Sequence, residues 1–250
     1  MGRFVSGSSA GGGSASGFPR RQSITLTASN PALAIPEWAQ GGKGVARITG
    51  CGAGASGAVA SPNAGAGGGG GAIASDHLMP IPAGISACAV VIGAGGAAVT
   101  SSAAAPGNPG GRTSIAIGAA IVRLNGGGNG SSSTSADGGA PTAGAAEYTY
   151  SGTAPTVDSI FGTNGMKASA SSLSIGGSGG SQTQSGGYSS GGQGPFGGTE
   201  VRSGPATANV NGASATGYGA GGQGVSTSGA AVTSGAGAPG FLTIIFEEGN

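Results

Sequence analysis

Short apolar runs next to glycine recur along this chain. Large apolar side chains gather in four of them, at residues 45–48, 89–92, 121–124 and 241–246. β-Branched and aromatic residues fill these runs, and glycine or proline bounds them, which is typical of buried strands. The pattern predicts a β core in which residues 241–248 form the closing strand. Phe241, Ile244 and Phe246 are among its large apolar side chains, and we expect Ile244 and one of the two phenylalanines to be buried in the core.

Two further segments alternate between apolar and polar positions, as half-buried strands do. From Gln22 onward, Ile24 and Leu26 share one face. Residues 110–117 alternate in the same way and lead through Gly118 into residues 121–124, which predicts a hairpin. The expected fold is therefore mainly β: a thin-cored, β-sandwich-like domain with long glycine-rich loops and, within them, polyglycine or polyproline-II-like segments.

Composition explains why the core must be thin. Leu, Ile, Val and Phe make up about 15% of the chain, below the usual level for a globular domain, whereas 60 residues are glycine. Ordering so many glycines is entropically costly, so a folded state must satisfy its backbone groups densely. We therefore expect backbone hydrogen bonds, more than side-chain burial, to hold the protein together.

The composition also divides the chain. Residues 1–21 are expected to form a flexible arm, with Phe4 and Val5 as a candidate docking peptide, and residues 22–250 a single glycine-rich β domain. Within it, glycine fills about one third of residues 176–240 without a strict every-third register, which excludes a collagen helix.

Two interpretations of residues 176–240 remain, disorder or extended glycine segments packed side by side. The apolar strand that follows favours order. Three aromatic residues in this region, Tyr188, Phe196 and Tyr218, are the candidate contact residues for a neighbour or a receptor, or else they fill gaps between loops and core.

The residues that carry catalysis in other proteins are sparse. His77 is the only histidine and stands beside Asp76, and the eight acidic residues show neither a carboxylate pair nor metal-ligand spacing. We expect both residues in a surface turn, and no catalytic residue, cofactor or metal. Residues 52–57 match G-x-G-x-x-G, but Pro62 and the following glycines exclude the helix that a dinucleotide site needs.

Charge and cysteine content limit the partners and the compartment. The formal net charge is +1, charged residues are 7% of the chain and no long basic run occurs, which argues against nucleic acid. The N-terminus lacks the apolar region of a signal peptide, and no run is long enough to span a membrane. Synthesis in the cytoplasm without membrane insertion is expected. Cys51 and Cys88 are either buried free thiols, which we favour, or a disulfide.

The order of these pieces resembles the glycine-rich domain found in bacteriophage tail fibres and related virion proteins. Five stretches carry the resemblance: 48–54, 91–96, 110–115, 124–128 and 237–246. It implies a non-enzymatic structural protein of the virion, at a tail or tail-fibre tip, that contacts other tail proteins and a host-cell receptor. It also implies a homo-oligomer, with threefold symmetry expected from phage fibres.

Two alternatives to a tail protein stay open. One is a capsid decoration or other packing protein of the same particle. The other is a secreted or ice-binding protein built from glycine helices, which predicts a signal peptide and a regular threonine or alanine face. A polysaccharide depolymerase, the enzymatic alternative, would need the missing carboxylate pair.

Overall fold

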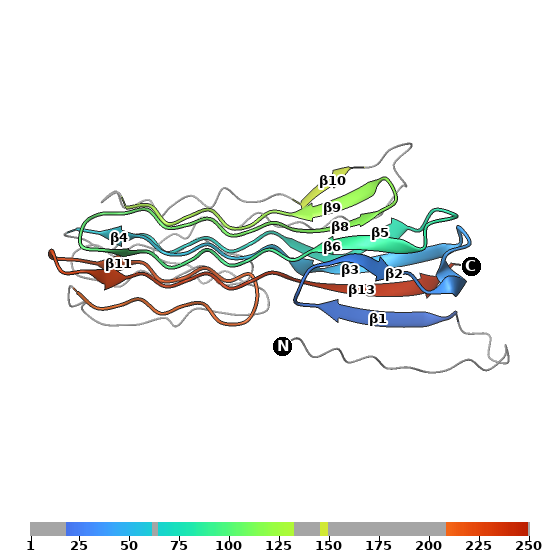
Figure 1. Ribbon diagram of the computed structural model, residues 1–250, viewed down its shortest axis with the longest axis horizontal. Coiled ribbons are helices and arrows are strands. Elements are labelled where there is room, and N and C mark those ends of the chain that lie inside the picture. The colour runs from blue at the N-terminus through green and yellow to red at the C-terminus, as the bar shows by residue number, and fades with distance from the viewer. Residues whose placement is uncertain (1–18, 62–64, 133–145, 150–208, 250) are drawn as a thin grey trace.

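A two-sheet β-sandwich continues lengthwise into a bundle of extended, glycine-rich segments (Figure 1). The computed structural model describes residues 19–61, 65–132, 146–149 and 209–249. Within these ranges the fold is mainly β, as the sequence predicts, and the strands of both large sheets are antiparallel. No helix in the described part of the chain has the length and apolarity that crossing a membrane requires.

The first sheet has the order β1-β13-β3-β5. Its strands are β1 (Arg21–Leu26), β13 (Phe241–Glu248), β3 (Gly44–Cys51) and β5 (Ile73–Pro80). The closing strand β13 thus lies in the middle of the sheet, where Ile244 is level with Ile24 on one side and Ile48 on the other. Strand β13, near the C-terminus, therefore pairs with two strands from the N-terminal part of the chain, β1 and β3.

The second sheet has the order β10-β9-β8-β6-β2. Its strands are β10 (Ala146–Thr149), β9 (Ala120–Leu124), β8 (Thr113–Ile117), β6 (Ala87–Val91) and β2 (Asn30–Ala34). The predicted hairpin is present as β8 and β9, with Ile117 paired to Ala120 and Gly118 at φ +59° in the turn. A left-handed φ of this kind costs glycine little, which explains the residue at this turn.

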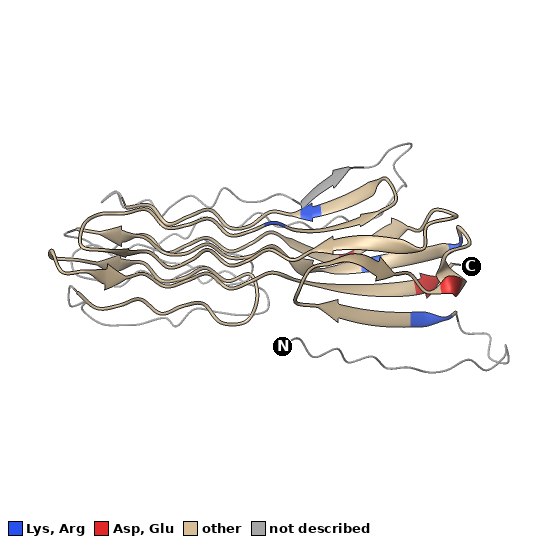
Figure 2. Ribbon diagram, in the orientation of Figure 1, with Lys and Arg blue, Asp and Glu red and all other residues tan. Residues whose placement is uncertain are grey.

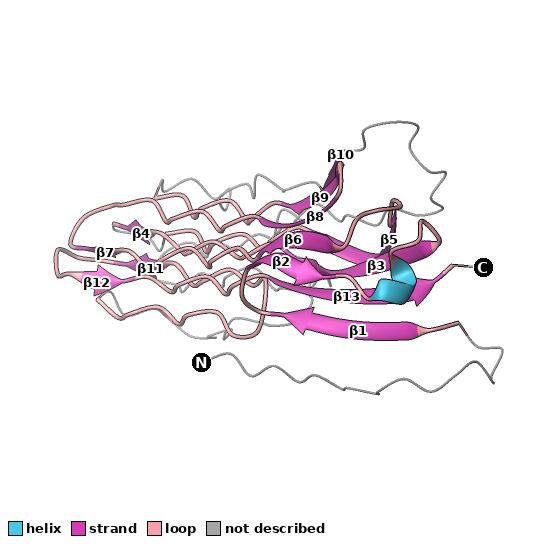
Figure 3. Ribbon diagram, turned by 45° about the vertical axis from the view of Figure 1, so that its right-hand side comes forward, coloured by secondary structure: helices cyan, strands magenta, loops and turns pink. Residues whose placement is uncertain are grey.

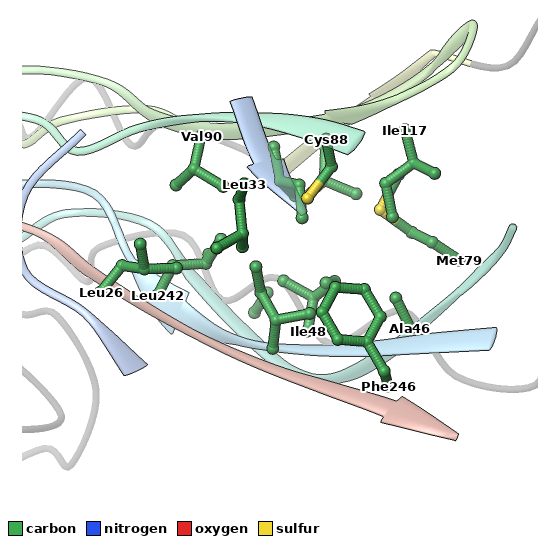
Figure 4. Close-up of a cluster of buried hydrophobic side chains, with 14 of the residues drawn as sticks. Leu26, Leu33, Ala46, Ile48, Met79, Cys88, Val90, Ile117, Leu242 and Phe246 are labelled. Carbon is green, nitrogen blue, oxygen red and sulfur yellow. The ribbon is translucent and has the colours of Figure 1, made fainter. Parts of the chain in front are cut away.

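The facing sides of the two sheets form the hydrophobic core (Figure 4). In β13, Leu242, Ile244 and Phe246 point into it and are fully buried, while Thr243 and Ile245 between them face outward and are half-buried. The other sheet contributes Val90, Ile115, Ile117, Val122 and Leu124 to the same core. Because only every second residue of a strand points into the core, a small number of large apolar residues is enough to fill it.

Four very short strands pair at the end of the bundle remote from the sandwich (Figure 3). Strand β4 (Val59–Ala60) pairs with β11 (Val225–Ser226), and β7 (Thr100–Ser101) with β12 (Val232–Thr233). Val59, Val225 and Val232 form a small buried cluster there, against which Val99 packs. One 3-10 turn, η1 (Glu37–Ala39), completes the described elements.

Candidate functional site: the glycine-rich bundle

The bundle is built from the chain that leaves and re-enters the two sheets. Residues 52–59 continue β3, and residues 65–72 return to β5. Residues 93–99 leave β6 and residues 125–131 leave β9. Residues 105–111 return to β8, and residues 232–240 return to β13. The recurring order of strand and glycine therefore corresponds to a structural arrangement. Each of these six strands runs on into its glycine-rich segment along the long axis of the molecule (Figure 1).

Residues 52–59 form the centre of the bundle and are completely buried. Their N–H groups turn to a new neighbour at each residue and return to the first neighbour after three. Gly52, Ala55 and Ala58 donate to residues 66–72 at 2.8–2.9 Å. The next residue in each case, Ala53, Ser56 or Val59, donates to residues 105–111. The residue after that, Gly54 or Gly57, donates to residues 235–238.

The carbonyl groups of the same segment bond to three other neighbours. Gly127 and Gly130 donate to Ala53 and Ser56, and Gly96 donates to Gly54. Residues 219–225 contribute the third set, from Gly222 to Ala55 and from Val225 to Ala58. The central segment thus has six neighbours, and each neighbour also bonds to the segments beside it. A repeat of three residues per turn without internal hydrogen bonds is the geometry of the polyproline II helix.

Direction decides which neighbours donate. Segments that return toward the sandwich, antiparallel to the centre, accept hydrogen bonds from it, and segments that run outward with it donate to it. This packing leaves no room for side chains at the closest approaches. A Cβ atom added at Gly54 would overlap the carbonyl oxygen of Ala220, and one at Gly57 that of Gln223. These glycines are therefore required by contact between backbones.

An eighth segment, residues 209–216, lies outside this ring against 219–225 and 232–240. Gly212 and Ala215 donate to Thr233 and Ala236 at 2.8 Å. Side chains complete the contact, because Asn211 Oδ1 accepts from Thr233 N–H at 2.8 Å and Ser214 Oγ from Ala236 N–H at 3.2 Å. Polar side chains of the eighth segment thus accept hydrogen bonds from the outward-pointing amides of Thr233 and Ala236.

The bundle carries no charged residue in its described segments, in contrast to the sandwich (Figure 2). Ion pairs cross the outer face of the first sheet, where Arg47 contacts Glu247 at 2.7 Å and Asp76 at 2.8 Å. These two hydrogen-bonded carboxylates raise the pKa of Arg47. The bundle therefore offers a partner only hydroxyl, amide and small apolar groups.

The structure places the predicted contact and core residues as follows. Tyr218 is half-buried at the sandwich end of the bundle, and its ring lies 5.0 Å from that of Phe241. Phe241 is buried by this contact on the face of β13 opposite the core, whereas Ile244 and Phe246 lie within the core. Tyr188, Phe196, Phe4 and Val5 lie outside the described residues.

The prediction that His77 lies in a surface turn is wrong. His77 belongs to β5, is 1% exposed and is level with Ile48 of β3. Burial lowers its pKa. Asp76 is exposed, but it also lies within β5, at a register shift where its φ is +54° and its N–H bonds to Thr49 Oγ1. The shift turns His77 into the core, an effect that no local sequence signal indicated.

The other candidate chemical groups are inert in this setting. Cys51 and Cys88 are free and buried, and desolvation raises their pKa to about 12 and about 11. Both thiols therefore stay protonated and unreactive at neutral pH. Among the described residues, no group of His, Cys, Asp and Glu side chains is arranged to hold a metal ion. Residues 52–57 are extended, as the rejection of a dinucleotide site requires.

Comparison with known proteins gives one finding on the whole chain. A family model described as a glycine-rich domain matches residues 25–247, which covers the bundle and, apart from the first residues of β1 and the last of β13, both sheets. No curated protein matches the chain.

Proposed function

Since the chain belongs to the glycine-rich domain family, we propose that it is a non-enzymatic structural protein of a phage virion, mounted at a tail or tail-fibre tip and contacting the host surface. The sandwich anchors it, and the bundle extends outward. In this role it acts as a homo-oligomer among other tail proteins.

The observation that carries the proposal is the internal bonding of the bundle. A row of buried, mutually hydrogen-bonded backbones holds its far loops at a fixed distance from the sandwich without a large core. Those loops, residues 102–104 and 227–230, are exposed or joined by side-chain hydrogen bonds such as Thr227 Oγ1 to the Ala230 carbonyl at 2.6 Å. A rigid, uncharged projection suits contact with a surface better than catalysis.

Labelling intact particles tests the location. An antibody against the sandwich, imaged by electron microscopy, should mark the tail or its fibres. Label on the head would favour the decoration protein, and the absence of the chain from purified particles would exclude the virion role. For the receptor role, Ser228→Arg at the far loop should reduce host adsorption at least tenfold, while Ala87→Arg on the exposed sandwich face should not change it.

One observation favours a second candidate. Ala94, Ala97 and Thr100 are exposed at intervals of three residues and form the kind of regular small-residue row that an ice-binding glycine-helix protein would use. Thermal hysteresis of the purified protein at micromolar concentration would support that function, and its absence would leave the virion role in place.

A further inference from the structure

Two neighbouring segments of the bundle expose backbone groups on their outer side. In residues 93–99, Gly96 donates to the central segment, whereas Ala94 and Ala97 are exposed residues whose amides donate to no acceptor among the described residues. In residues 105–111, Asn108 accepts from Ser56, but the carbonyls of Pro106 and Pro109 receive no donor in the same part of the chain. One row of donors and one row of acceptors thus lie side by side.

Elsewhere in the bundle, the position outside a neighbouring outward segment and returning segment is occupied. Residues 219–225 run outward, as 93–99 do, and residues 232–240 return, as 105–111 do. Gly222 donates to the central segment, and the next residue, Gln223, donates to Ala213 of the eighth segment at 3.1 Å. The carbonyl of Gly235 accepts from the central segment, and that of the next residue, Ala236, accepts from Ala215 at 2.8 Å.

The unfilled pair has the same register. Ala97 follows Gly96 as Gln223 follows Gly222, and Pro109 follows Asn108 as Ala236 follows Gly235. With three residues per turn, equal offsets from the central segment mean equal directions, so Ala97 N–H and the Pro109 carbonyl point to one position beside both segments. Ala94 and Pro106 repeat this position one turn away.

We propose that this position, the open edge formed by Ala94, Ala97, Pro106 and Pro109, binds an extended strand of a partner polypeptide rich in glycine, alanine and serine. The strand accepts hydrogen bonds from the two alanine amides and donates to the two proline carbonyls. At the occupied position, residues 209–216 likewise donate to the carbonyls of Thr233 and Ala236 and accept from the Gln223 amide. The site depends only on the bundle and holds whether or not the chain is a virion protein.

The chemistry of the edge defines the partner. The four residues are uncharged and small or rigid, so a strand in polyproline II conformation can approach closely, with contacts about 9 Å apart along its axis. Proline has no N–H, so the row that points outward from residues 105–111 cannot donate and presents carbonyls alone. Arg112 lies three residues beyond Pro109, so this edge has a positive charge at its sandwich end.

A peptide with the sequence of residues 209–216, capped at both ends, is a suitable probe because that segment occupies the equivalent position. Added at millimolar concentration to the 15N-labelled full chain, it should shift the amide resonances of Ala94 and Ala97 saturably and leave Gly96 unchanged. Shifts confined to Gln223 and its neighbours would mean exchange with the resident segment, and they would contradict the proposal, as would no shift at all.

Proline substitutions test whether peptide binding depends on the amides of the open edge or responds to any proline in this segment. Ala97→Pro removes one donor while keeping the extended backbone, which proline favours, and it should weaken peptide binding at least tenfold. Ala98→Pro is the matched control, because Ala98 is also exposed but its N–H points a third of a turn away. The affinity of this variant for the peptide should stay within twofold of that of the unaltered chain. Equal weakening by both variants would overturn the site. If the chain alone dimerises and Ala97→Pro abolishes this, the occupant is a second copy and the proposed partner strand is wrong.

Discussion

At the scale of single residues, His77 shows how a local pattern can mislead. Asp76 before it and Pro80 after it favour a turn, and polar neighbours favour exposure. In the structure the register shift at Asp76 breaks the alternation of β5, so that His77 and Met79 share the buried face. The information that places His77 lies in the pairing with β3, far from it in sequence.

The buried histidine predicts a dependence of stability on pH. Its folded-state pKa is lowered, so below about pH 6.5, the ordinary value for histidine, the unfolded chain binds a proton that the folded chain does not. The free energy of unfolding should therefore be constant with respect to this group above pH 7 and should fall as the pH drops toward 5. Urea denaturation at pH 8 and pH 5 measures the difference.

His77→Gln provides the comparison, because it removes the titrating group and keeps a polar side chain of similar size. Its unfolding free energy should change less between the two pH values than that of the unaltered chain. Equal losses in both proteins would show that carboxylates, and not His77, cause the dependence.

At the scale of elements, β13 has two faces with different tasks. Ile244 is fully buried between the sheets, and Ile245 beside it is half-buried on the outer face. We predict that Ile244→Ala lowers the free energy of unfolding by about 2–5 kcal/mol through lost burial and a residual cavity. Ile245→Ala, which removes the same atoms, should cost clearly less. Chemical denaturation with equal m-values tests this, and equal losses would remove the organising role of β13.

The strands were predictable because each carries its own signal. The apolar run of β13, the alternation in β1 and the glycine turn between β8 and β9 all appear within a few residues. The bundle segments carry no such signal, since Gly54, Ala55 and Ser56 differ little in hydropathy yet bond to three different neighbours. Sequence could show that backbone bonding must dominate, but not which segments bond.

At the scale of the whole molecule, stability depends on close contact between backbones at the centre of the bundle. Gly57→Ala would push its Cβ into the Gln223 carbonyl and displace a segment that bonds to several others. We predict destabilisation by about 1–3 kcal/mol or more, measured as a fall in thermal midpoint. Gly41→Ala is the control, since nothing lies within 4 Å of the added atom. A midpoint equal to that of the control would contradict the predicted packing.

The three-residue register of the central segment also sets a rule for how such a molecule can change in length. Deleting one residue from 52–59 would rotate every later N–H toward the wrong neighbour, and two residues would do the same in the other sense. Only a loss or gain of three restores the match, and the surrounding segments must follow by the same amount. The length of the bundle can therefore change only in steps of three residues in every segment, whereas the loops that join its segments can gain or lose single residues.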